Sequence, residues 1–142
     1  MKMKKSIIIF SIVILQGCSV DDNSNGIIQD LAPIISVNIP TSFIASKSYE
    51  MGINYERPSS CHYFAGLDIT QKNNEVTIGV VNHSKTSSSN CSKSGDLSKT
   101  TSLKFVVERN DFYIFRFWKG ENSLGEDEFI IKQIPVAQPD DE

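Results

Sequence analysis

Apolar and polar residues alternate with a period of two along much of the chain after residue 33. Residues 49–55 place Tyr, Met, Ile and Tyr on one side and Glu, Gly and Asn on the other. Successive side chains of an extended strand point to opposite faces, so this alternation is typical of a strand with one buried face. The same pattern, or an apolar run of strand length, occurs in residues 34–39, 49–55, 61–69, 76–80, 103–107, 112–119 and 129–136.

Strand-breaking residues separate these segments. Pro40 and Pro58 follow the first two, and Asn73-Asn74 provides a turn later in the chain. Short strands separated by such residues predict an all-β fold, a single antiparallel immunoglobulin-like β-sandwich of about seven strands. A small barrel is the alternative. We assign this domain to residues 33–137 and expect residues 138–142 to be a disordered tail.

The segment 112–119 differs from the others because it is apolar on both faces. Aromatic residues alternate on one face, while Ile114, Arg116 and Trp118 lie on the other. A strand with one solvated face should be polar on that side. We favour the interpretation that residues 27–35 cover the second face, since large exposed apolar patches are rare on monomers. Otherwise these three residues form a binding patch, for which aromatic and Arg side chains are well suited.

The first 17 residues have the properties of a signal peptide. Three lysines within the first five residues precede an apolar run over residues 6–15. That run is about half the roughly 20 residues that a helix needs to cross a bilayer. The sequence Leu-Gln-Gly-Cys, which ends at Cys18, resembles the lipobox of bacterial lipoproteins. In that family the cysteine is acylated on its sulfur and becomes the first residue of the mature protein.

This resemblance implies that residues 1–17 are removed and that acyl chains on Cys18 hold the protein to a membrane, with residues 18–32 as a flexible tether. Ser19 follows the cysteine, where an Asp would resemble the inner-membrane retention signal of enteric lipoproteins. The outer membrane is therefore favoured, on its periplasmic face or on the cell surface. Residues 18–22 are also similar to the anionic tethers of Bacteroidetes-type lipoproteins sent to the cell surface.

The charge of the chain argues against one class of partner. Removal of the three leading lysines leaves 11 basic residues against 17 acidic ones, a net charge of −6. Binding to nucleic acid without sequence preference needs a basic face that displaces counterions from phosphates. We therefore expect no nucleic-acid partner, and membrane attachment through the lipid on Cys18 rather than through charge.

The cysteines predict a disulfide bond. Lipidation uses Cys18 and leaves Cys61 and Cys91 in an oxidising compartment, where a pair of cysteines is normally bonded. A zinc site made of these two cysteines with His62 and His83 is the alternative. It is disfavoured because Cys61 and His62 are neighbours in a predicted strand and would point to opposite faces.

A short segment has a resemblance of its own. Residues 111–115, Asp-Phe-Tyr-Ile-Phe, loosely resemble the start of strand F of immunoglobulin domains, where a Tyr stands two residues before a cysteine. Phe115 occupies the place of that cysteine, so the usual disulfide between the two sheets is absent.

These features favour a lipid-anchored envelope protein whose sandwich binds a protein or glycan partner without catalysis, and no cofactor is expected. The main alternative is a small exported hydrolase with His62 or His83 as general base. A histidine within hydrogen-bonding distance of a Ser, Asp or Glu in a concave pocket would favour that alternative. A third hypothesis is an exported protease inhibitor that would insert the Ser-rich loop 84–102 into a cleft.

Overall fold

A computed structural model describes residues 26–138, which contain strands and no helix. Cys18 and the signal peptide lie outside this range, as does the tail beyond residue 138. The strands are β1 (Ile27–Ala32), β2 (Ile34–Asn38), β3 (Phe43–Ile44), β4 (Ser48–Glu56), β5 (Tyr63–Lys72), β6 (Glu75–Lys85), β7 (Ser98–Val106), β8 (Phe112–Glu121) and β9 (Asp127–Ala137).

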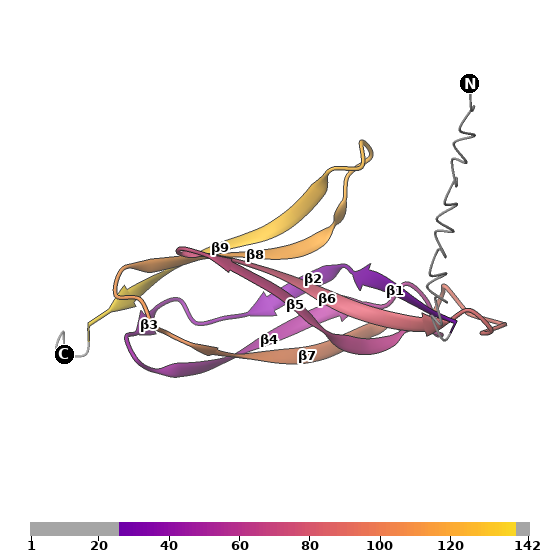
Figure 1. Ribbon diagram of the computed structural model, residues 1–142, viewed down its shortest axis with the longest axis horizontal. Helices are drawn as coiled ribbons and strands as arrows, with labels where there is room; N and C mark the ends of the chain where they lie inside the picture. Colours follow the sequence, from indigo (N-terminus) through magenta and orange to yellow (C-terminus); the bar gives the residue numbers. More distant parts are fainter. Residues whose placement is uncertain (1–25, 139–142) are drawn as a thin grey trace, which may run out of the picture.

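The strands form two sheets that pack face to face, so the prediction of an all-β sandwich is confirmed (Figure 1). The larger sheet has the order β1-β6-β8-β9-β3, and β5 pairs with β6 beside this path. The smaller sheet has the order β2-β4-β7. The two faces that meet carry the alternate apolar residues of each strand, as a packed sandwich requires.

An aromatic cluster joins the two sheets. Phe115 of β8 is fully buried, with its ring centroid 5.1 Å from that of Phe105 in β7 and 5.9 Å from that of Phe43. Rings at these separations and near-perpendicular angles interact favourably in addition to the area that they bury. Phe115 therefore helps to hold the two sheets together by packing.

The connection between β7 and β8 is closed by Tyr113. Its hydroxyl oxygen accepts the backbone N–H groups of Glu108 and Arg109, each at 3.0 Å. Immunoglobulin domains use a tyrosine in the same kind of corner contact. On the surface of this corner, the Arg109 guanidinium and the Phe112 N–H bind the Asp111 carboxylate and lower its pKa from 3.8 to about 2.

Two parts of the sequence-based prediction need correction. Residues 27–32 are not part of a flexible tether, because they form β1, pair with β6 and bury Ala32 completely. The sandwich therefore begins at Ile27 rather than at residue 33. The pairing is also not antiparallel throughout, since β6 runs parallel to β8 and β3 runs parallel to β9.

The larger sheet divides into two branches where β8 stops pairing with β6. One edge of β6 is shared: β8 pairs with its first part as far as the pair Phe117–Ile78, and β1 pairs with the rest from Val80 onward. Because β1 occupies this edge, the far end of the β8–β9 hairpin leaves the sheet and projects from the body (Figure 1). A register shift between Trp118 and Gly120 accompanies the departure, as a bulge bends a strand.

Candidate functional site

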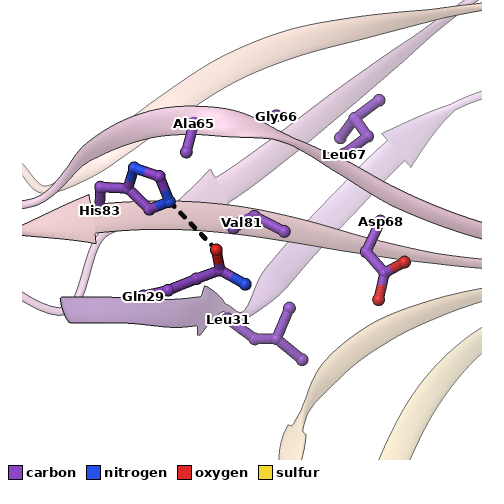
Figure 2. A pocket seen from close by; sticks show the side chains of 8 residues that line it. All are labelled: Gln29, Leu31, Ala65, Gly66, Leu67, Asp68, Val81 and His83. Atoms are coloured by element: carbon purple, nitrogen blue, oxygen red, sulfur yellow. Dashed lines mark hydrogen bonds between the residues drawn. The ribbon is translucent and has the colours of Figure 1, made fainter. Parts of the chain in front are cut away.

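A hollow of about 600 Å³ lies on the outer face of the larger sheet, over β1, β5 and β6. It is open to solvent, and Figure 2 shows the side chains from the three strands around it. The lining residues are Gln29, Leu31, Ala65, Gly66, Leu67, Asp68, Val81 and His83.

The sequence produces this hollow in two ways. Gly79 has no side chain at a point of close approach: a Cβ atom there would lie 3.2 Å from a terminal methyl carbon of Leu31. A register shift between Phe64 and Gly66 also bends β5, and Gly66 has a φ of 155°, which other residues rarely adopt. Both features move atoms away from the space above β6.

The two polar groups at one end of the hollow hold each other in place. The Nε2 atom of His83 lies 3.1 Å from Oε1 of Gln29 and donates to it, since that oxygen can only accept. The amide N–H groups of Gln29 and the second ring nitrogen of His83 are not used in this bond. Among the drawn side chains, Asp68 lies at the other end and is not bonded to any of them (Figure 2).

The floor between these ends is apolar. Leu31 and Val81 are direct partners in the β1–β6 pairing and lie side by side on the outer face. Leu31 is 39% exposed, which is high for a leucine in a sheet. The hollow therefore combines hydrogen-bonding groups at its rim with apolar area at its floor.

The patch predicted at Ile114, Arg116 and Trp118 lies on this same outer face, and all three residues are half-buried. The favoured interpretation that residues 27–35 cover it is wrong. Within that segment, β1 lies beside β6 in the same sheet, and β2 belongs to the facing sheet. Neither can lie over the outer face of β8.

Neighbours within the sheet hold the two large side chains of the patch instead. The guanidinium carbon of Arg116 lies 4.3 Å from the ring centroid of Phe129, and a guanidinium nitrogen is 3.6 Å from the Glu75 carboxylate. The indole N–H of Trp118 donates to Asp127 at 2.7 Å. The patch is therefore fixed in position and partly open to solvent.

The predicted disulfide between Cys61 and Cys91 is confirmed. It ties the β4–β5 connection to the loop between β6 and β7, and the backbone N–H of Ser60 donates to the Ser92 carbonyl beside it at 2.8 Å. The bonded sulfurs are not free thiolates, so these two cysteines cannot ligate zinc in this state. The loop itself spans residues 86–97, shorter than predicted because β6 and β7 extend into the Ser-rich segment.

Beside this disulfide, three polar side chains form a hydrogen-bonded chain that the sequence did not predict. Nδ1 of His62 lies 2.8 Å from the Ser59 hydroxyl, and Nε2 lies 3.1 Å from an Asp30 carboxylate oxygen. Ser59 and His62 are near each other in sequence, but only the pairing of β1 with β6 brings Asp30 to them. A second hollow, of about 360 Å³, is lined by Ser59, His62 and both bonded cysteines.

Comparison with known proteins gives no family for this chain: no protein-family model, curated protein or solved structure matches it. Within residues 26–138 there is also no helix long and apolar enough to cross a membrane. In the same range, no group of three or more His, Cys, Asp or Glu side chains is placed to hold a metal ion.

Proposed function

We propose that the chain is a lipid-anchored protein of the bacterial cell envelope whose β-sandwich binds a ligand without catalysis. The observation that carries this proposal is the convergence of Gln29, Leu31, Val81 and His83 on one open hollow of the outer sheet face. The lipobox-like sequence at Cys18 supports the location.

The chemistry of the hollow fits a neutral ligand rich in hydroxyl groups, that is, a glycan. Gln29 supplies amide donors, His83 a ring nitrogen, and Asp68 a carboxylate that accepts hydroxyl donors. The apolar C–H face of a sugar ring would lie on Leu31 and Val81. The net charge of −6 on the mature chain disfavours polyanionic ligands. The half-buried patch of Ile114, Arg116 and Trp118 extends the same face and would contact a longer ligand.

Removing the polar end of the hollow should weaken glycan binding. We expect Gln29→Ala and His83→Ala each to reduce affinity for neutral oligosaccharides by about 5- to 10-fold, because one net hydrogen bond contributes about 1 kcal/mol. Binding to an array of neutral oligosaccharides, followed by calorimetry on the best of them, measures this effect.

The matched control is Gln133→Ala. It removes the same side chain from the exposed outer face of β9, outside the hollow. Because Gln133 pairs with Ile114 of the patch, the control applies to short oligosaccharides that fill only the hollow, whose affinity should change less than 2-fold. Equal losses in Gln29→Ala and Gln133→Ala would contradict the assignment of the hollow. If no oligosaccharide binds and Gln29→Ala instead abolishes capture of one protein, the ligand is a protein and the glycan assignment is wrong.

A hydrolase is the second candidate, favoured by the chain of Ser59, His62 and Asp30. These are the residue types of a nucleophile, a base and an orienting carboxylate. Ser59 is only 3% exposed, however, and its hydroxyl oxygen also accepts the Cys61 N–H at 3.3 Å. A nucleophile must contact its substrate. The hydrogen bonds among Ser59, His62 and Asp30 therefore fit a structural role better, in which they fix β1 to the β4–β5 connection.

A serine-reactive fluorophosphonate probe distinguishes the two candidates. We expect no labelling of the folded protein, because Ser59 is only 3% exposed. Labelling that is lost in Ser59→Ala and kept in Ser60→Ala would favour hydrolysis over binding.

A further inference from the structure

Strand β5 lies at an edge of the larger sheet. Within residues 26–138 it pairs with β6 and with no other strand. Its ten residues are exposed or half-exposed along their whole length, including Ile69 at 44% exposure. A long exposed edge presents unpaired N–H and C=O groups that can accept another strand.

The register identifies which backbone groups are free. The Ile114 N–H donates to the Asn74 carbonyl, so the even-numbered residues at the start of β6 turn their backbone toward β8. Odd-numbered residues of β6 therefore turn toward β5, where their partners are Lys72, Thr70 and Asp68. The residues between these partners direct their N–H and C=O groups away from β6, to the free edge. They are Leu67, Ile69 and Gln71.

The charges of β5 distinguish it from β7, which is an edge of the smaller sheet. Strand β7 carries Lys99 and Lys104 and no acidic residue, and lysines on an edge discourage pairing with a copy of the same strand. Strand β5 carries one acid, Asp68, and one base, Lys72, four positions apart on the same outer face.

We propose that β5 pairs antiparallel with β5 of a second copy of this chain, with the two-fold axis at Thr70. In this register Asp68 of each copy lies directly opposite Lys72 of the other, which gives two opposite-charge pairs. Ile69 of one copy lies opposite Gln71 of the other. Both residues direct their backbone N–H and C=O groups to the free edge, so this register allows backbone hydrogen bonds between the two copies. A register with Asp68 opposite itself would place like charges together.

The pairing also covers apolar area. Ile69 is the direct partner of fully buried Ile78, so it faces the inside of the sandwich, yet it remains 44% exposed. In the proposed register the two copies of Ile69 are diagonal neighbours across the axis and shield each other. One strand pair is a small interface, and confinement of both copies to one membrane would raise their effective concentration. Leu67 and Asp68 of β5 also line the hollow, so the second copy would lie beside it. The backbone pairing itself requires no ligand in the hollow.

A cysteine at the axis tests the dimer in the mature, membrane-bound protein. Opposed residues that do not exchange hydrogen bonds have Cα atoms about 4.5 Å apart, which is within the range of a disulfide. We expect Thr70→Cys to give a covalent dimer on a non-reducing gel. Thr100→Cys, an exposed threonine of β7, is the control and should stay monomeric. Equal cross-linking of the two variants would overturn the proposal.

Charge exchange tests the register. In the Thr70→Cys background, Asp68→Lys places Lys opposite Lys72 of the other copy and should reduce the covalent dimer at least 5-fold. Adding Lys72→Asp restores opposite charges and should restore the dimer. An unchanged yield in Asp68→Lys, or no recovery in the double exchange, would contradict the register. A thermal melt of each variant confirms that it is folded. Loss of glycan binding in Gln29→Ala leaves this readout unaffected, so the two proposals fail separately.

Discussion

Replacing Cys61 and Cys91 together by serine is expected to lower the free energy of unfolding by about 3 to 4 kcal/mol. The bond joins residues 30 positions apart, and a closed loop of this length restricts the unfolded chain considerably. In the folded state the same bond holds the loop of residues 86–97, which is largely exposed. Thermal denaturation should show a midpoint that falls by roughly 10 to 20 °C.

The matched control removes a hydrogen bond between the same two segments. Ser60→Ala deletes the hydroxyl that accepts the Ser92 N–H at 3.0 Å, and should cost no more than about 1 kcal/mol. Wild-type protein melted with a reductant should match the double serine variant. A midpoint within a few degrees of wild type in both cases would show that the bond contributes little to stability.

Replacing Cys18 by serine is expected to abolish lipid attachment completely. Serine has no thiol to accept the diacylglyceryl group, and in the lipoprotein pathway acylation comes before cleavage of the signal peptide. Each buried methylene contributes about 0.8 kcal/mol to membrane attachment, so the loss of two or three acyl chains is the largest change in binding expected for any substitution in this chain. Metabolic labelling with a radioactive fatty acid measures it directly.

The intact mass provides a second measurement for this variant. The Cys18→Ser chain should retain residues 1–17, while wild type begins at an acylated Cys18. Ser19→Ala, one position later, is the control and should be labelled and processed like wild type. Unchanged labelling of Cys18→Ser would contradict the lipobox assignment and, with it, the proposed location in the envelope.

The fold class follows from the sequence because alternation records which face of a strand is buried. It locates β4, β8 and β9 within a few residues. It does not locate β1, since Gln29 and Asp30 interrupt its apolar residues and its burial comes from pairing with β6, far away in sequence. The two residues of β3 are too short to produce a periodic signal. The parallel direction of β8 on β6 depends on how the whole chain folds and has no local signature.

In the candidate site, too, features with a local sequence signal could be predicted, and features that depend on strand pairing could not. The disulfide could be predicted because a count of cysteines and the expected compartment are sufficient. The hollow could not, because Gln29 and Leu31 meet His83 and Val81 only through the register of β1 on β6. Asp30 and His62 are likewise 32 positions apart, and no sequence motif relates them. The patch residues were identified by their unusual composition, but the side chains that hold them come from β9 and from Glu75 of β6.

The pairing of β1 with β6 also leads to an expectation about the order of events in folding. Ile27 pairs with Lys85, so the first strand of the domain waits for a partner almost sixty residues later in the chain. Synthesis begins at the N-terminus, and contacts between such distant residues form slowly. We therefore expect the N-terminal edge of the sandwich to close late, with β1 unpaired until β6 has been made and has taken its place in the sheet.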